Sequence, residues 1–277
     1  GSILATSNGV CISTDGIAVS PWKPFIGADK AVIVDSKGQK HDVECLLGAN
    51  EIYDIAKFQV SGKTAAAPLA TTVSAGDEVW LTPILKSGNA EKANVTSVEK
   101  FMDKYNYAIL SSSATDKMNG VPVFDKKGQV IGLYNKSGDS QSSTDANYAK
   151  DFVLKGLSQN DVTLRQSDIR IGLPNTLEEA VVALMLSSEK PANIHEAIVN
   201  EFITKFPQSN DGYYALANIQ IAKGEVANAD KTMQTAIGKV TAKDEAHYNF
   251  ARLIYRNALI QEFAEKTSLP YPSARVS

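Results

Sequence analysis

The chain has 277 residues, and its 28 lysines and arginines against 31 aspartates and glutamates give a net charge of -3. This length suffices for two compact domains, since one domain averages roughly 100–200 residues. No basic block occurs and the first arginine is Arg165, which argues against nucleic acid as a partner. No apolar run approaches the about 20 residues that span a bilayer, so we expect no membrane insertion.

Short apolar runs separated by turns make up residues 2–60. Turns are expected at Thr14–Gly16 and Ser36–Gly38, where a glycine follows polar residues. The expected strands are Ile3–Thr6, Val10–Ser13, Ile17–Ser20, Ala31–Val34, Asp42–Leu47 and Ile55–Val60. Strands of this length and spacing are typical of a β-barrel or a β-sandwich.

A second set of strands is expected after the small-residue connector Gly62–Pro68. These strands are Val79–Pro83, Ala93–Val98, Tyr107–Leu110, Val121–Phe124, Val130–Tyr134 and Ala146–Phe152. Their number and spacing match those of the first set. The sequence therefore predicts a second barrel that follows the first along the chain.

The two cysteines, Cys11 and Cys45, both lie in strand-like runs. They fit either a disulfide in an oxidising compartment or two buried thiols that act as small apolar side chains. Neither the cysteines nor the three histidines form a metal-ligand pattern. We expect no metal and no cofactor.

The pattern changes from period two to period 3.6 at about Leu173. Helices are expected at Thr176–Ser187, Ala192–Phe206, Asn210–Lys223, Val226–Val240 and Ala242–Thr267. Short turns between them indicate antiparallel hairpins. Tyr213 and His247 begin two stretches of similar apolar spacing, separated by the about 34 residues of a tetratricopeptide (TPR) repeat. The last part of the chain thus resembles TPR-type helical hairpins.

Residues Lys117–Asp125, followed by Val130–Ile131–Gly132, carry a further resemblance. They resemble the nucleophile region of trypsin-like serine proteases, nearest to the high-temperature-requirement (HtrA-type) branch, which usually reads G-x-S-G-G-P. Asn119 stands at the nucleophile position and Lys117 at the glycine that turns an oxyanion-hole N–H inward. Gly120 and Pro122 are kept, whereas Val121 replaces a further glycine.

The stretch Gly9–Ser20 resembles the opening of the same family, which leads to the general-base histidine. Lys23 stands at that histidine's position, between Trp22 and Pro24. The segment Tyr53–Phe58 resembles the family's T-D-L-A-V-L, and Asp54 keeps the aspartate that orients the base. A lysine ammonium is a poor proton acceptor at neutral pH. We therefore expect Lys23 and Asp54 to form an ion pair that plugs the former active site.

The resemblance covers about residues 2–156 and implies a mixed β and α architecture. We expect a trypsin-like double β-barrel over residues 1–160, a linker over 161–173 and a TPR-like helical domain over 174–277. The resemblance also implies a bacterial periplasmic or secreted protein whose signal peptide has been removed.

The leading functional interpretation is an inactive protease homologue, a pseudoenzyme, that binds a peptide or protein partner. The family presents its peptide-binding edge at the positions of Leu133, Tyr134, Asn135 and Lys136. Two alternatives stay open. One is a serine-type endopeptidase with an atypical active site, and the other is a TPR-type scaffold for a protein complex. The sequence leaves the partner's identity and the oligomeric state open.

Overall fold

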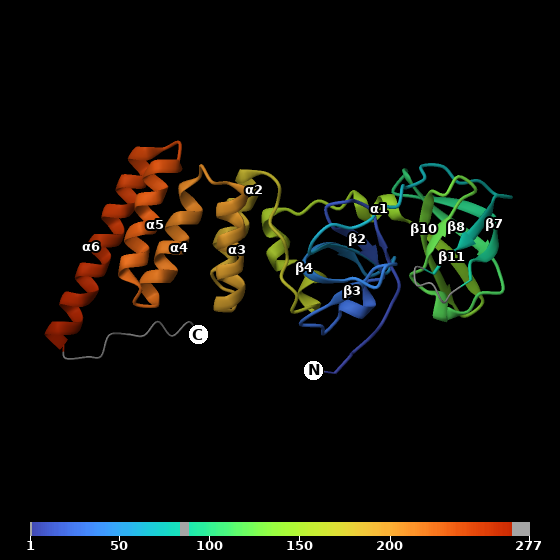
Figure 1. Cartoon of the computed structure of the whole chain (residues 1–277), viewed down its shortest axis with the longest axis horizontal. Coiled ribbons are helices and arrows are strands. Elements are labelled where there is room, and N and C mark those ends of the chain that lie inside the picture. Colours follow the sequence, from blue (N-terminus) through green and yellow to red (C-terminus); the bar gives the residue numbers. More distant parts are fainter. Residues whose placement is uncertain (1, 84–88, 268–277) are drawn as a thin grey trace. The chain divides into compact units, whose positions relative to one another are not determined.

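The computed structural model describes residues 2–83 and 89–267, which fall into two compact units (Figure 1). The first unit contains the residues up to Leu154 together with Asn160–Gly172, and the second contains Lys155–Gln159 and the residues from Leu173 onwards. All the described strands lie in the first unit, and the long helices lie in the second. The mixed β and α architecture expected from the sequence is confirmed.

The first set of strands forms a five-stranded antiparallel sheet in the order β1-β2-β5-β4-β3. The strands are β1 (Val10–Cys11), β2 (Ile17–Ser20), β3 (Val32–Val34), β4 (Lys40–Asn50) and β5 (Ile55–Val60). The sheet is an open half-barrel, because β1 and β3 remain its two edges. The expected strand Ile3–Thr6 is wrong: these residues belong to none of the described strands, and they are exposed.

The second set of strands closes into a six-stranded barrel in the order β10-β11-β8-β7-β6-β9. The strands are β6 (Glu78–Leu81), β7 (Glu91–Phe101), β8 (Tyr105–Ser111), β9 (Pro122–Phe124), β10 (Val130–Ser137) and β11 (Ser140–Asp145). Its core consists of alternate apolar residues such as Val79, Leu81 and Val123, each fully buried. This alternation is what the period-two pattern predicted.

The last strand of the barrel is not where the sequence placed it. Residues Ala146–Lys150 form helix α1 in place of the expected strand Ala146–Phe152, and β11 precedes it. Asp145 caps the helix, because its side chain accepts the N–H of Asn147. The barrel closes with the polar run Ser140–Asp145, whose last residues are buried by strands β8 and β10.

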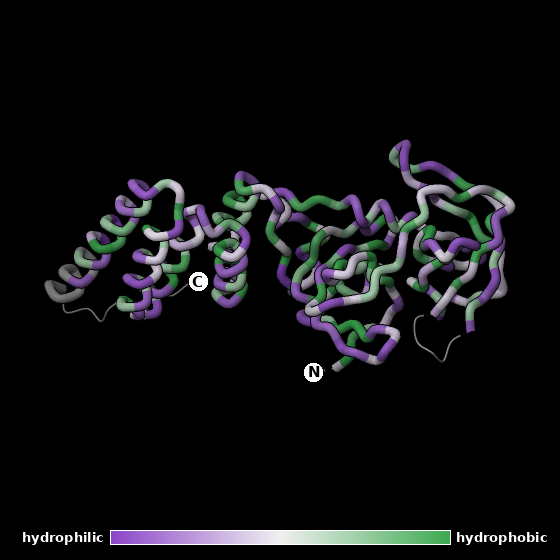
Figure 2. The backbone as a smooth tube through the Cα atoms, turned by 45° about the horizontal axis from the view of Figure 1, so that its top comes forward, coloured by the Kyte–Doolittle hydropathy of each residue, from purple (hydrophilic) through white to green (hydrophobic). Residues whose placement is uncertain are grey.

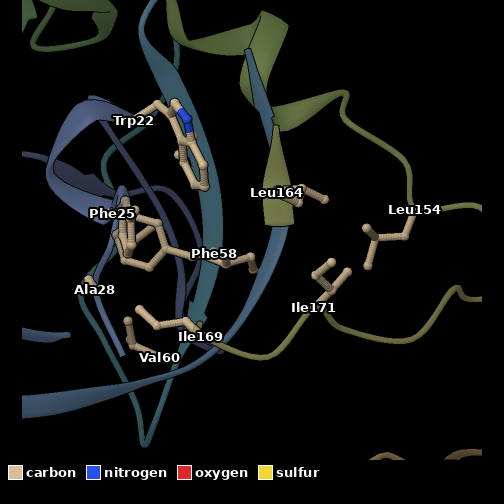
Figure 3. Close-up of a cluster of buried hydrophobic side chains, with 12 residues drawn as sticks. Trp22, Phe25, Ala28, Phe58, Val60, Leu154, Leu164, Ile169 and Ile171 are labelled. Carbon is tan, nitrogen blue, oxygen red and sulfur yellow. The ribbon is translucent and has the colours of Figure 1, made fainter. Parts of the chain in front are cut away.

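Of the expected linker over residues 161–173, all but Leu173 belong to the first unit and pack against its sheet, whereas Leu173 belongs to the second unit. Leu46 donates its N–H to the carbonyl of Arg170 and accepts the N–H of Gly172. Figure 3 shows Ile169 and Ile171 directed into the same apolar cluster as Phe25 and Phe58. The physical reason is the apolar alternation of Ile169 and Ile171, which makes a short strand-like segment that pairs with β4.

The two strand sets meet through a shared apolar cluster. It joins Val19 and Ile55 of the first sheet to Val130 and Leu133 of the barrel, together with Tyr148 of α1. The ends of β2 and β5 are thereby held against the start of β10. The candidate site lies in the loop after β2, the turn before β5 and the loop before β9.

The second unit contains helices α2 (Leu177–Ser187), α3 (Ala192–Lys205), α4 (Asn210–Ala222), α5 (Val226–Lys239) and α6 (Lys243–Thr267). Figure 2 shows hydrophobic and hydrophilic residues alternating along these helices, as amphipathic packing requires. Consecutive helices pack side by side, and the cores of α2–α4 and α4–α6 contain Phe202 and Met233 respectively. Within the described residues, no helix is both long and apolar enough to cross a membrane.

A buried histidine stabilises the turn between β3 and β4. The side chain of His41 is 1% exposed, and its Nδ1 lies 2.7 Å from the carbonyl of Ser61 while its Nε2 lies 3.3 Å from Oδ2 of Asp35. Both ring nitrogens face acceptors, which suits the doubly protonated ring. The Ser61 carbonyl, followed by the Asp35 carboxylate, raises the pKa of His41 above its ordinary value.

We expect the stability of the protein to fall as the pH rises above neutrality. A raised pKa in the folded state gives a stabilisation that is complete below the ordinary value of about 6.5 and is lost as the pH passes through the folded-state value. Urea unfolding of the wild type and of His41→Gln across that range measures it. The free energy of unfolding should depend less steeply on pH in the variant than in the wild type. An equal dependence in both proteins would contradict the assignment to His41.

Candidate functional site

Lys23 and Asp54 lie together, as the sequence predicted for the base and its orienting carboxylate. The backbone N–H of Lys23 donates to Oδ1 of Asp54 at 2.8 Å, and the Lys23 Nζ lies 3.8 Å from Oδ2. Lys23 begins a short 3-10 helix, Lys23–Phe25, and Asp54 lies in the turn before β5 with a φ of 47°. The carboxylate therefore fixes the main chain at the position where the family has its base.

The ion pair does not plug a buried site. The Lys23 side chain is 77% exposed and that of Asp54 is 20% exposed. Trp22, only 1% exposed, is the residue that points inward here, and its ring stacks on Phe25 at 5.8 Å. Because the indole occupies the apolar core, the adjacent lysine is turned to the solvent.

We expect Lys23→Ala to change the free energy of unfolding by only about 0–1 kcal/mol, the range for exposed ion pairs. The hydrogen bond from the Lys23 main chain to Asp54 stays intact in this variant, since alanine keeps the N–H. Thermal unfolding measures the effect. A loss of several kcal/mol would show that the ammonium group is far more constrained than its exposure indicates.

The main chain around Asn119 does not present an oxyanion hole. Residues Asp116–Met118 form a 3-10 turn, in which the N–H of Asn119 donates to the carbonyl of Asp116 at 3.0 Å. An oxyanion hole requires the N–H of the nucleophile residue to point at the reacting group. Here that donor is used inside the turn. Lys117, at the other oxyanion-hole position, is exposed.

The side-chain amide of Asn119 binds the main chain of β10. Its Oδ1 accepts the N–H of Lys136 at 2.6 Å, and its Nδ2 donates to the carbonyl of Lys136 at 3.2 Å. These two bonds replace the pair of main-chain hydrogen bonds that a residue of a neighbouring strand would form with Lys136. Asn119 therefore pairs with the N–H and the carbonyl of Lys136, which face away from β11.

The preceding outward-facing residue of β10, Tyr134, is also paired. Its N–H donates to the carbonyl of Val121 at 2.9 Å, and its carbonyl accepts the N–H of Gly120 at 2.8 Å. Of the predicted peptide-binding residues, Leu133 and Tyr134 have buried side chains, whereas Asn135 and Lys136 are partly exposed. In this conformation the predicted edge is closed from Tyr134 to Lys136 by residues 119–121.

The loops that carry Lys23 and Asn119 meet at Gly120. Gly120 has a φ of 84°, and a Cβ added there would lie 2.6 Å from the carbonyl oxygen of Asn8 and 2.8 Å from Cδ of Pro21. The side chain of Asn8 in turn donates to the carbonyl of Asn119 at 3.2 Å. The structure thus brings the predicted base and nucleophile segments together.

Asn8 is a member of the site that sequence reasoning missed. It lies before the first strand, 111 residues away from Asn119 along the chain. Only the Gly9 that follows it carried a signal, as part of the stretch that resembles the family's opening. The contact of Asn119 with Lys136 was also unforeseen, because it depends on the direction of one side chain.

Within the described residues, no group of three or more His, Cys, Asp and Glu side chains is placed to hold a metal ion. Cys11 and Cys45 are both present as thiols. Burial raises the pKa of the Cys11 thiol, which opposes thiolate formation. Cys45 is buried, and Cys11 packs against the apolar cluster of the first sheet.

Comparisons with known proteins find a likeness only among solved structures, and over about half of the chain. No protein-family model and no curated protein sequence matches the chain. Among solved structures it is similar to an HtrA-type protease, AlgW with a decapeptide, with 15% sequence identity and a TM-score of 0.44. The match covers 51% of this chain and 48% of the other, so the chain spans about half the length of the structure it matches.

Proposed function

We propose that this protein is an inactive homologue of trypsin-like serine proteases that binds an extended segment of a peptide or protein. The observation that carries the proposal is the pairing of the Asn119 side chain with the main chain of Lys136. It concerns both halves of the proposal, since Asn119 stands at the nucleophile position and Lys136 lies on the predicted peptide-binding edge.

The loss of chemistry is supported by the groups at each predicted position. Acyl transfer by a serine protease needs a hydroxyl, a base that accepts its proton and N–H donors for the oxyanion. Asn119 offers an amide, Lys23 offers an exposed ammonium group, and the N–H of Asn119 is bonded to Asp116. Asp54 remains, and its carboxylate binds the main chain of Lys23. In this proposal that aspartate has a structural role.

The binding of an extended segment is supported by the geometry of the β10 edge. A peptide that adds a strand to a sheet edge exchanges main-chain hydrogen bonds with alternate residues of that edge. Asn119 holds the N–H and the carbonyl of Lys136 through a single side chain, which can rotate away. An incoming peptide would replace both bonds at Lys136, so the Asn119 side chain would be exchanged for a real strand there, while the main-chain bonds of Tyr134 to Gly120 and Val121 stay in place.

Removal of the Asn119 side chain should strengthen peptide binding. Each hydrogen bond is worth about 0.5–1.5 kcal/mol net, so Asn119→Ala should lower the dissociation constant of edge-binding peptides by roughly ten-fold. Asn135→Ala is the matched control, since Asn135 is a neighbouring, half-exposed asparagine whose main chain is paired with β11. Binding to an array of unstructured peptides with alternating apolar residues measures both variants.

Two results would contradict this site. If Asn119→Ala binds no peptide of the array more tightly than the wild type does, peptides do not compete with the Asn119 side chain. If Asn135→Ala strengthens binding equally, the gain reflects general loosening of the edge. A wild-type protein that cleaves the bound peptides would instead favour the alternative of an endopeptidase with an atypical active site.

A scaffold function has its own supporting observation in the helical unit. Helices α4, α5 and α6 surround a mainly apolar hollow of about 250 Å³. Its lining includes Ile221, Met233, Phe250, Leu253 and Ile254. Ile254 is 57% exposed, so Ile254→Glu in the full chain would place a charge at the rim. Loss of a bound protein partner in this variant, with peptide binding by β10 unchanged, would favour the scaffold.

The assignment of the helical hairpins to the TPR type belongs to the same proposal and rests on the spacing of Tyr213 and His247. A periplasmic or secreted location is likewise proposed from the resemblance to HtrA-type proteases. Fractionation of cells that produce the full-length natural protein tests the location, and recovery in the cytoplasm would contradict it.

A further inference from the structure

A second hollow of the helical unit, of about 550 Å³, lies where alternate helices begin. Figure 1 shows consecutive helices running in opposite directions, so α2, α4 and α6 start at the same end. The lining comes from Leu177 of α2, from residues 205–211 between and within α3 and α4, and from Thr241, Ala242 and Glu245 around the start of α6. We call it the helix-start hollow. Its volume lies within the roughly 300–1,000 Å³ of ligand sites.

Asn210, the first residue of α4, brings a buried acceptor without a partner to this lining. The residue is 5% exposed, and its Nδ2 donates to the carbonyl of Ala242 at 2.9 Å. That bond identifies the nitrogen end of the amide, because an oxygen in its place would face another acceptor. The Oδ1 is covered from solvent and accepts no hydrogen bond within the described residues. Buried acceptors in native proteins are nearly always paired, so this one calls for a ligand that donates.

The charge that is left free in the lining is negative. Asp211 and Glu245 are both exposed, and neither forms an ion pair within the part of the chain that the structure describes. Lys205 is the cation of the lining, but its Nζ is held elsewhere. It donates to the carbonyl of Leu173 at 3.2 Å and to Oδ1 of Asn175 at 2.8 Å, and both residues lie outside the lining.

Helix N-termini on their own attract anions, and here the chain supplies the negative groups itself. Asp211 stands in the first turn of α4, where Oγ of Ser209 accepts its N–H at 3.4 Å. Asp244 and Glu245 stand in the first turn of α6. An anion would therefore meet two carboxylates and the free oxygen of Asn210. The same groups favour a cation with several N–H donors.

An arginine side chain has the donors and the shape that this lining requires. Its planar guanidinium group carries five N–H donors in a fixed fork, enough for the amide oxygen and both carboxylates. Guanidinium groups also stack on aromatic rings, and Phe206 is a partly exposed member of the lining. Leu177, 45% exposed, and the exposed Pro207 offer apolar contact to the residues beside the arginine.

We propose that the helix-start hollow binds an arginine side chain of a peptide or protein partner. The guanidinium group is bonded to Oδ1 of Asn210 and paired with Asp211 and Glu245. The residues on either side of the arginine lie on Leu177 and Pro207. This site is independent of the proposed peptide site on β10, and either of the two can fail without the other.

NMR titration of the 15N-labelled full chain with short peptides tests the ligand. The probe is an end-capped leucine-arginine-leucine peptide, which should shift the side-chain amide of Asn210 saturably. The same peptide with citrulline, which keeps the shape of arginine and lacks its charge, should bind roughly ten-fold more weakly. An end-capped single arginine lacks the flanking leucines and should bind about three-fold more weakly than the probe.

Substitutions that remove one charge and keep the size of the side chain test the site. Asp211→Asn and Glu245→Gln should each raise the dissociation constant of the probe about three-fold, and both together about ten-fold. Asp244→Asn is the matched control, since Asp244 stands in the same first turn of α6 and is exposed, but does not line the hollow. It should leave the dissociation constant unchanged.

Four results would overturn the proposal. The citrulline peptide binds as tightly as the probe, or saturation with the probe leaves the side-chain amide of Asn210 unshifted. Asp244→Asn weakens binding as much as Glu245→Gln does, which would reveal a general effect of charge. The single capped arginine binds as tightly as the probe, which would make the ligand a small molecule and not a segment of a partner.

Discussion

The purified wild-type protein should cleave neither casein nor a fluorogenic peptide library. Removal of the catalytic triad from a serine protease lowers the rate about a million-fold, which leaves turnover below ordinary detection. The structure adds that the N–H of Asn119 is bonded to Asp116, so the residual contribution of an oxyanion hole is absent as well. Measured turnover that disappears in Asn119→Ala, and is not due to a contaminating protease, would overturn this account.

Restoration of the side chains provides the positive control. Lys23→His with Asn119→Ser supplies a base and a nucleophile, but the turn Asp116–Met118 still holds the N–H of residue 119. A fluorophosphonate probe should therefore not label this double variant. Further replacement of Lys117 and Val121 by glycine should give the first labelling. Glycine at both positions lets the main chain of the turn change direction, so that the N–H of residue 119 is released from Asp116. Val121 is 1% exposed in the barrel core, so folding of that variant must be verified by circular dichroism.

The second large effect is expected from Gly120→Ala. Gly120 has a φ of 84°, and the added methyl group would approach the carbonyl of Asn8 and the ring of Pro21 within 3 Å. The left-handed backbone costs about 1–2 kcal/mol for alanine, and the overpacking costs about 1–3 kcal/mol more. Urea unfolding should therefore show a destabilisation of about 2–5 kcal/mol.

Gly128→Ala is the matched control for the packing contribution. Gly128 has a similar φ of 75°, but a Cβ there would meet no atom within 4 Å. Only the backbone cost of about 1–2 kcal/mol applies to it. Equal effects of the two substitutions would show that the loops of Lys23 and Asn119 are not packed together around Gly120.

Much of the fold could be predicted from local patterns. The strand Ile55–Val60 and the helices from Leu177 onwards follow their apolar periods within a residue or two at the ends. The predictions fail where the alternation of apolar and polar residues does not distinguish a strand from other structure. The run Ser140–Asp145 has no apolar residue, so its burial as β11 depends on the strands beside it. Ala146–Phe152 alternates like a strand, yet the cap by Asp145 starts a helix there.

The candidate site was predictable as a set of positions and not as a set of contacts. Lys23 and Asp54 were matched to the family pattern, and the structure places them together. Their exposure could not be read from the sequence, because it follows from Trp22 filling the core beside them. Likewise, Asn119 was identified only through the resemblance of Lys117–Asp125 to the nucleophile region of trypsin-like proteases. Its hydrogen bonds to Lys136 require knowledge of how the strand β10 runs past the loop.

The most direct test of the central claim is an NMR titration of the 15N-labelled protein with a peptide from the array. We predict that the side-chain amide of Asn119 and the backbone amide of Lys136 shift together as peptide is added, and that the peptide remains uncleaved in the same sample. Saturable binding that leaves both signals unchanged, or the appearance of cleavage products, would contradict the account.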